Sequence, residues 1–199
     1  MKTIRIGKLE ILGLNFREEF ESFFQTNSDP YFFELPGCED MRLLAYLSMQ
    51  FKNCTLLNIS TSPEHSALAL SYNRSNTVHS FVLADKANNP QIRAHPRLRF
   101  EQVNLWESHS YKALIKSCPL IFLDIDPHEG TLEYQFYKYL KEIGYEGILV
   151  CDDIHHFEGM RKFWQFVTEH EKHDVSRFGH WSGTGLINFN RDLRFEFVG

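Results

Sequence analysis

Short apolar runs alternate with amphipathic segments along most of this 199-residue chain. The runs predict buried strands, because a sheet covered on both faces needs strands that are apolar almost throughout. Strands are predicted at residues 54–60, 77–84, 98–104, 119–126 and 146–153, and two more, of opposite sense, at 173–179 and 185–190. Apolar residues at helical spacing predict helices at 61–72, 110–117, 131–144 and 159–172.

Strands that alternate with helices indicate a doubly wound α/β fold, in which a mostly parallel sheet carries helices on both faces. The opposite sense of the two closing strands makes the last strand antiparallel. Ahead of the sheet, the pattern predicts a short strand or hairpin at 4–12 and helices at 17–27 and 39–51. We therefore divide the chain into an N-terminal strand and helix extension, residues 1–38, and a Rossmann-like domain, residues 39–199.

Two of the predicted strands end in paired carboxylates. The stretch IFLDIDPHEG (121–130) contains Asp124 and Asp126, and GILVCDDIHH (147–156) contains Asp152 and Asp153. In a doubly wound sheet, ligands bind outside the carboxyl ends of the strands. Four carboxylates at this edge repel one another unless a cation neutralises them, and hard oxygen ligands favour Mg²⁺, Mn²⁺ or Ca²⁺. A single aspartate at a strand end is more often a turn former, but two pairs on neighbouring strands favour a site.

Histidines and a tryptophan follow these carboxylates along the chain. His155 is a candidate base, ligand or substrate contact, and His128 has the same alternatives, whereas His156 is expected to be a solvated loop residue. The stretch GHWSGTG (179–185) brings His180 and Trp181 to a tight return between the last two strands. The alternative for this stretch is a glycine-rich turn with a packing tryptophan.

The loop after the first buried strand, NISTSPEHSA (58–67), has the order strand, small-residue turn and helix. In this order the backbone N–H groups of the helix start can face a cofactor. Ser60, Thr61 and Ser62 stand where a glycine-rich turn is usual, and Pro63 suits the first position of a helix that either Thr61 or Ser62 caps. Taken alone, this pattern is a weak signal for a cofactor site.

Composition removes several classes of function. The net charge of −5 gives no basic surface for nucleic acid, and no apolar run is long enough to span a membrane. The N-terminus lacks the apolar core of a signal peptide. Four cysteines without CxxC spacing, Cys38, Cys54, Cys118 and Cys151, indicate buried free thiols in a reducing compartment, and we expect a cytoplasmic protein.

With these residues placed, the chain resembles the class I S-adenosylmethionine-dependent methyltransferases from about residue 39 to residue 188. Within that superfamily it is most similar to the metal-dependent O-methyltransferases that act on sugar hydroxyls (the macrocin type), whose fourth strand ends in D-x-D and whose fifth ends in D-D. EDMRLLAYLS ahead of the first core strand and GMRKFWQFV after the fifth are also similar.

The resemblance implies roles for particular residues. Asp124, Asp152 and Asp153 become ligands of Mg²⁺ (or Mn²⁺ or Ca²⁺), Asp126 becomes the general base, and His155 is added as a catalytic residue. His128, His180 and Trp181 are assigned to the substrate. S-adenosylmethionine is assigned to Asn58, Ser60, Thr61, Ser62, Ser66, Asp85, Asn104 and Asp124. Two departures stand out: Ser60 replaces the usual glycine, and Val82 replaces the usual ribose-binding acid, with Asp85 three residues on.

The activity implied is methylation of a hydroxyl on a sugar or glycan, with a small acceptor that carries adjacent hydroxyls. Three alternatives stay open. One is a catalytically silent Rossmann-like binding module of a glycan-modifying system. Another is a catechol-type O-methyltransferase, since catechols also present adjacent hydroxyls to a metal. The third is a metal-dependent hydrolase, for which more histidine ligands or a second metal cluster are expected.

Overall fold

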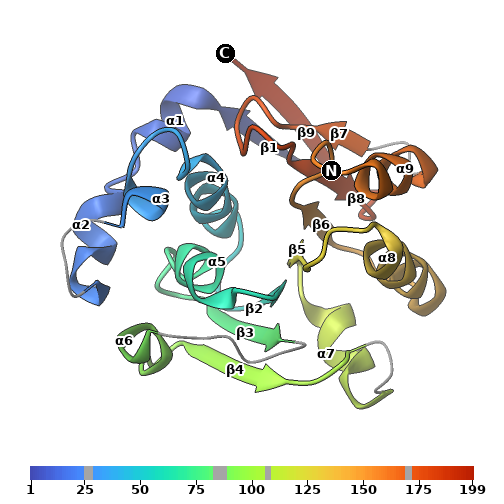
Figure 1. Ribbon diagram of the computed structural model, residues 1–199, viewed down its shortest axis with the longest axis horizontal. Helices are drawn as coiled ribbons and strands as arrows, with labels where there is room; N and C mark the ends of the chain where they lie inside the picture. The colour runs from blue at the N-terminus through green and yellow to red at the C-terminus, as the bar shows by residue number, and fades with distance from the viewer. Residues whose placement is uncertain (25–28, 83–88, 106–108, 169–171) are drawn as a thin grey trace.

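The computed structural model describes residues 1–24, 29–82, 89–105, 109–168 and 172–199. In these ranges a seven-stranded sheet of order β4-β3-β2-β5-β6-β8-β7 forms the centre of the molecule (Figure 1). Its strands are β2 (Thr55–Ser60), β3 (Thr77–Val82), β4 (Leu98–Gln102), β5 (Leu120–Asp124), β6 (Ile148–Cys151), β7 (Lys172–Asp174) and β8 (Gly185–Asn188). β8 pairs antiparallel with β6 and β7, and the other pairs are parallel. The predicted doubly wound sheet with an antiparallel strand is confirmed.

Helices cover both faces of this sheet (Figure 1). On one face lie α4 (Glu39–Ser48), α5 (Pro63–Leu70) and α6 (Pro90–Arg93), and on the other lie α7 (Lys112–Ser117), α8 (Thr131–Ile143) and α9 (Glu158–Phe166). A 3-10 turn, η2 (His109–Tyr111), precedes α7. The sequence pattern predicts these helices except α6, whose four residues are too few to show a period.

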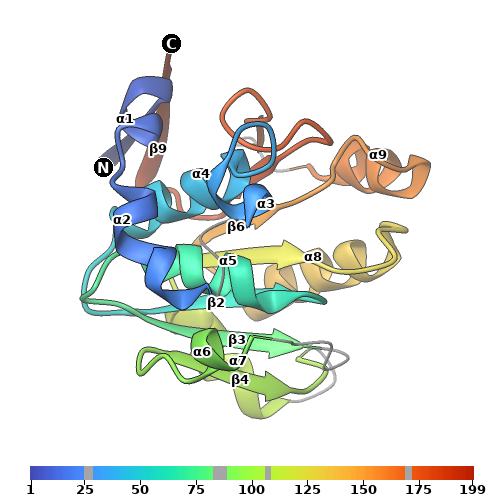
Figure 2. The ribbon, with the colours of Figure 1, turned by 60° about the vertical axis from the view of Figure 1, so that its left-hand side comes forward.

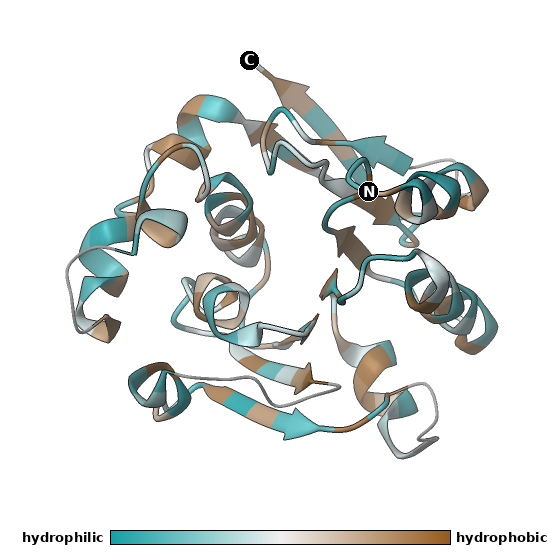
Figure 3. Ribbon diagram, in the orientation of Figure 1, coloured by the Kyte–Doolittle hydropathy of each residue, from teal (hydrophilic) through white to brown (hydrophobic). Residues whose placement is uncertain are grey.

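The strand residues divide between two hydrophobic cores. Along β5, Leu120 and Phe122 join the core under α4 and α5, whereas Ile121 and Leu123 join the core under α8 and α9. This alternation follows from the two-residue period of a strand. All four side chains are buried, which is why the run is apolar throughout (Figure 3).

The N-terminal segment is joined to the C-terminal end of the chain. β1 (Lys2–Gly7) pairs in parallel with β9 (Leu193–Val198) in a separate two-stranded sheet, and the sequence pattern does not predict β9. Residues 8–12 form α1 (Lys8–Leu12), so residues 4–12 do not form a hairpin, and the predicted strand is present only up to Gly7. Then come α2 (Phe16–Phe20), the 3-10 turn η1 (Glu21–Phe23) and the unpredicted α3 (Pro30–Phe33). Their phenylalanines pack on the core beneath α4 and α5. The division of the chain into an extension and a Rossmann-like domain at residue 38 stays a prediction.

Some predicted elements are shorter than expected. The predicted strand 173–179 contains only β7, because residues 175–179 turn back toward β8. Residues 25–27 and 169–171 of two predicted helices, and residues 83–84 of a predicted strand, fall outside the described residues. All four cysteines are free, with Cys38, Cys118 and Cys151 buried and Cys54 half-buried. Within the described ranges, no helix is both long and apolar enough to cross a membrane.

Parallel strands bring their carboxyl ends to one edge of the sheet, as the arrowheads of β2, β3 and β4 show (Figure 2). The residues after β5 and β6 lie at this edge, and so does the turn from β7 to β8, since β7 runs parallel to β6 across the antiparallel β8. The start of α4 lies there as well, because its helix runs back along the sheet to β2. This edge therefore holds most of the predicted site.

Candidate active site at the carboxyl edge

The ends of β5 and β6 bring the two aspartate pairs together. Asp124 is the last residue of β5, and Asp152 follows β6, with its backbone N–H donating to the carbonyl of Leu123 at 3.0 Å. Asp153 has a φ of 59°, in the left-handed region, which turns the chain sharply after Asp152. The turn lets both carboxylates of the D-D pair face the end of the sheet instead of opposite sides of a strand.

Two histidines lie among these carboxylates. His128 Nε2 is 3.0 Å from Asp126 Oδ1, 3.5 Å from Asp153 Oδ2 and 3.8 Å from Asp124 Oδ1. His180 Nδ1 is 3.8 Å from Asp153 Oδ1. Asp153 therefore has one histidine beside each of its two oxygens, and the predicted residues His128 and His180 both belong to the cluster.

The turn between β7 and β8 places His180 there. Ile154 N–H donates to the carbonyl of Gly183 and His155 N–H to that of Ser182, so the turn is fastened to the chain just after the D-D pair. Gly183 has a φ of 105°, and a Cβ at this position would lie 2.8 Å from the backbone nitrogen of His155. Only glycine fits this contact, which makes GHWSGTG more than a flexible return.

The pKa values of the clustered aspartates shift in different directions. Burial raises the pKa of Asp152 well above its ordinary value, and the nearby charges of Asp40, Asp124 and Asp153 raise it further. Burial also raises the pKa of Asp124, against the opposing charge of His128. For Asp153, the neighbouring polar groups of His180 and Ser182 outweigh burial and lower the pKa. The Asp153 carboxylate in turn raises the pKa of His180.

Asp40, in the first turn of α4, is a member of this cluster that the sequence does not reveal. It is 6% exposed, and its Oδ1 has no hydrogen-bond partner among the described residues. Burial raises its pKa from 3.8 to about 7, with His180 as the main opposing charge. An acidic residue in the first turn of a helix ordinarily serves the helix dipole at the surface, so only burial distinguishes Asp40.

The serine-rich loop after β2 is bound to the end of β5. Ser60 Oγ donates to Asp124 Oδ2 at 2.9 Å and accepts from the backbone N–H of Ser62. Thr61 N–H donates to the carbonyl of Asp124, and Thr61 Oγ1 accepts from the N–H of Asp126. None of the three loop residues has a positive φ, so the turn does not require the usual glycine. Ser62 precedes α5 and Pro63 begins it, as expected, although no side chain caps the helix.

The other residues predicted for the cofactor differ in their surroundings. Asn58 and Ser66 are buried beneath the loop, where both donate to the carbonyl of Pro63. Asn104 follows β4, and its Oδ1 is buried without a hydrogen-bond partner in the described part of the chain. Val82 ends β3 and is buried, and Asp85 lies outside the described residues.

His155 is not brought to the carboxylate cluster. Its Nε2 lies 2.7 Å from Asp174 Oδ2 on β7, and its side chain is half-exposed. The neighbouring His156 packs edge-on against Trp181, with ring centroids 5.8 Å apart. The left-handed turn at Asp153 sends the following residues toward β7, so sequence proximity to the D-D pair misleads for His155.

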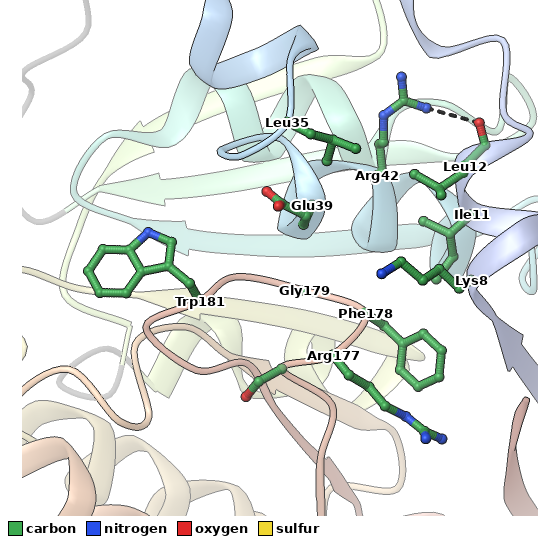
Figure 4. A pocket seen from close by; sticks show the side chains of 11 residues that line it. Lys8, Ile11, Leu12, Leu35, Glu39, Arg42, Arg177, Phe178, Gly179 and Trp181 are labelled. Carbon is green, nitrogen blue, oxygen red and sulfur yellow. Dashed lines mark hydrogen bonds between the residues drawn. The ribbon is translucent and has the colours of Figure 1, made fainter. Parts of the chain in front are cut away.

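A pocket lies between α1, the start of α4 and the β7–β8 turn (Figure 4). Leu35, Glu39 and Arg42 form one wall, Phe178 and Trp181 come from the β7–β8 turn, and α1 closes the far end. Its cavity volume is about 200 Å³. Two lining residues, Glu39 and Trp181, are the chain neighbours of Asp40 and His180 in the cluster. Trp181 is 72% exposed, which leaves its ring available to a ligand.

The donor set fits a divalent cation. Asp152, Asp153 and His180 each offer a ligand atom, and these atoms lie within 4.8 Å of one another. Asp152 is 9% exposed, and its Oδ1 lacks a hydrogen-bond partner among the residues described. A buried carboxylate oxygen with no partner is costly, and a cation would remove that cost.

Comparison with known proteins supports the fold. No protein family model matches the chain, and no curated protein matches it significantly in sequence. Among solved structures, the cofactor-bound protein Rv0187 from MTB is similar with a TM-score of 0.59 at 13% identity, over 87% of this chain and 96% of that one. An O-methyltransferase from Bacillus cereus in complex with SAH is similar with a TM-score of 0.51 at 13% identity, over 89% and 86% of the two chains. An SAH-bound methyltransferase from Podospora anserina is similar with a TM-score of 0.53 at 12% identity, over 90% and 87%.

At these identities the likeness concerns the fold alone. The expected Rossmann-like α/β architecture is confirmed, and the solved structures that share it include methyltransferases bound to SAH. The resemblance to the sugar-modifying subgroup stays a prediction. The chain thus has the α/β Rossmann-like methyltransferase fold.

Proposed function

We propose that this protein is an S-adenosylmethionine-dependent O-methyltransferase that uses a divalent cation and methylates a hydroxyl of a sugar or glycan. The observation that carries the proposal is the position of two aspartate pairs at the carboxyl ends of β5 and β6, on a sheet with the methyltransferase strand order. The loop after β2, which is the proposed cofactor site, and the carboxylates that would bind the cation then lie at the same edge of the sheet.

The cofactor is assigned to the loop after β2 and to the end of β4. Ser60 and Thr61 bind that loop to Asp124 and Asp126, so the proposed cofactor loop and the aspartates after β5 are held in one arrangement. Asn104 has a buried acceptor oxygen, which suits the exocyclic amino group of adenine. When bound, S-adenosylmethionine supplies the methyl group from its sulfonium sulfur.

The acceptor is assigned to the pocket beside the cluster. Trp181 offers an exposed aromatic face to a sugar ring, and the acceptor hydroxyls would reach the carboxylates past Glu39. Asp124, Asp152 and Asp153 would hold the divalent cation, which would lower the pKa of the acceptor hydroxyl. Asp126, half-exposed and held 3.0 Å from His128, accepts the hydroxyl proton. The C–O bond forms as the C–S bond breaks, and the products are the methyl ether and S-adenosylhomocysteine.

A catechol is the second candidate acceptor. It also presents two adjacent hydroxyls, and the apolar side chains of Leu35, Phe178 and Trp181 in the pocket suit a flat aromatic ring. A screen for S-adenosylhomocysteine production that sets vicinal-diol sugars against catechols separates the two candidates. Acceptors with one of the two hydroxyls already methylated are the matched controls, because they keep the ring but lose the chelating pair.

The screen also tests the methyltransferase proposal as a whole. We expect turnover that requires both the divalent cation and the adjacent hydroxyls. A protein that binds neither S-adenosylmethionine nor S-adenosylhomocysteine would be a silent binding module. Hydrolysis of a substrate such as an ester in the absence of S-adenosylmethionine would favour a hydrolase.

A further inference from the structure

We infer that the cation at this edge is a transition-metal ion held by Asp152, Asp153 and the imidazole of His180, with Asp40 as a buried carboxylate beside it. The inference rests on the cation requirement of the proposed function and changes its ligand set. His180 then acts as a metal ligand and not as a substrate contact, and Asp124 is not required as a direct ligand.

The distances are compatible with shared coordination. Ligand atoms about 2.1 Å from one metal ion lie roughly 3 to 4 Å from each other. His180 Nδ1 and Asp153 Oδ1 are 3.8 Å apart, and the three ligand atoms of Asp152, Asp153 and His180 all lie within 4.8 Å. To coordinate one metal ion, the most distant atoms of the set would have to approach by about 1 to 2 Å, and His180 Nδ1 would exchange its 2.5 Å hydrogen bond with Ser182 Oγ for the metal. The turn that carries His180 is fastened by backbone hydrogen bonds to Ile154 and His155, so it moves as one unit with the D-D pair.

Asp40 is the second, independent sign of a bound cation. It comes from α4, far from the D-D pair in the chain, and it is nine-tenths buried with an unpartnered Oδ1 in the described structure. It lies close enough to Asp152 that its charge acts on that residue more strongly than the charge of Asp124 or Asp153. Two buried aspartates, each with an oxygen that lacks a partner, destabilise a fold when both are ionised, unless a cation lies between them.

Asp124 is occupied by other partners. Its Oδ2 accepts from Ser60, and its Oδ1 faces His128 at 3.8 Å. Its role in this arrangement is to hold the loop after β2 against the cation site. By contrast, Asp153 Oδ1 lies 3.8 Å from His180 Nδ1, and Asp152 Oδ1 has no hydrogen-bond partner in the described structure.

An imidazole nitrogen changes which metal the site prefers. Carboxylates and water suit Mg²⁺ and Ca²⁺, whereas imidazole suits Co²⁺, Zn²⁺, Fe²⁺ and related ions. A site with two carboxylates and one histidine is therefore expected to bind Co²⁺ and Mn²⁺ more tightly than Mg²⁺. The preference for Co²⁺ should depend on His180, while Mg²⁺ gains little from a nitrogen ligand.

The test is metal binding by the whole chain without any cofactor or acceptor. Co²⁺ is titrated by its visible absorption, which changes with the ligand atoms, and Mg²⁺ is titrated by calorimetry. We expect His180→Asn to lower Co²⁺ affinity at least about 10-fold, the smallest loss typical of groups that support a metal site. Mg²⁺ affinity should change much less. His155→Asn is the matched control, because His155 lies at the same edge but pairs with Asp174.

Asp40 has its own matched control. Asp40→Asn should weaken Co²⁺ binding about 10- to 100-fold. Glu39→Gln removes the same charge from the adjacent, half-buried position, and it should have little effect. Equal losses in the two variants would mean that only long-range charge matters and would overturn the role of Asp40.

The remaining outcomes also decide the question. Equal losses of Co²⁺ and Mg²⁺ affinity in His180→Asn, or no loss, would overturn the assignment of His180 as a ligand. An unchanged Co²⁺ affinity in Asp152→Asn together with a large loss in Asp124→Asn would place the cation between β5 and His128 instead. Because no S-adenosylmethionine is present, failure of this inference is distinct from failure to bind the cofactor.

Discussion

Replacing Asp40 with asparagine should stabilise the metal-free protein at neutral and alkaline pH. Burial raises the pKa of Asp40 from 3.8 to about 7, so the folded protein holds this proton more tightly than the unfolded chain does. Such a group costs nothing below pH of about 4, costs more as the pH rises, and reaches its full cost above about 7. At 1.36 kcal/mol for each pKa unit, the full cost is about 4 kcal/mol.

Asparagine has nearly the same shape and carries no charge at any pH. The unfolding free energy of Asp40→Asn relative to the wild type should therefore rise with pH, by about 4 kcal/mol between pH values of about 4 and 8. The assay is urea denaturation across this pH range with a metal chelator present. Glu39→Gln serves as the control for removal of a neighbouring charge.

The same measurement with saturating Co²⁺ extends the test. A bound cation neutralises the charge of Asp40, so the stabilising effect of asparagine should shrink or reverse in sign. A stability difference that changes with pH by less than about 1 kcal/mol would refute the reasoning, since a pKa raised from 3.8 to about 7 requires a larger change. A wild type that is more stable than the variant at every pH would refute it as well.

Three further perturbations test other parts of the site. Asp126→Asn should lower kcat at least about 100-fold, which is the scale of general-base catalysis, and should leave the Co²⁺ affinity unchanged. Full activity of this variant would show that Asp126 is not the general base. Ser60→Ala removes a buried hydrogen bond to the Asp124 carboxylate and should lower the unfolding free energy by about 1.5 to 3 kcal/mol at neutral pH. Ser66→Ala is the control and should cost less, because the Ser66 hydroxyl donates at 3.4 Å to an uncharged carbonyl. Trp181→Ala should raise the acceptor KM about 3- to 10-fold in steady-state assays and leave S-adenosylhomocysteine affinity unchanged; an unchanged KM would remove Trp181 from the acceptor pocket.

The core of the fold is predictable because each strand is buried on both faces. The runs around Phe122 and Val150 contain no polar residue that would place them at a surface, and the aspartates at their ends then fall on one edge by topology alone. β9 escapes the same reasoning. Its partner is β1, at the other end of the chain, and LRFEFV shows no local sign of that pairing.

The site is predictable only where it follows the strands. The D-x-D and D-D pairs are correctly placed together, but His155 turns toward Asp174 because Asp153 takes a left-handed conformation that no local pattern announces. Asp40 is hidden for a different reason. Its burial depends on how α4 packs beside the β7–β8 turn, a contact between segments more than a hundred residues apart.

Calorimetric titration with S-adenosylhomocysteine, with and without a divalent cation, tests the central claim most directly. The account predicts binding with micromolar affinity, since the loop after β2 is already fixed to Asp124 and Asp126 and needs no glycine to form. Absence of binding at millimolar concentration in both conditions would contradict it, and would leave a carboxylate cluster on a methyltransferase fold without a methyl donor.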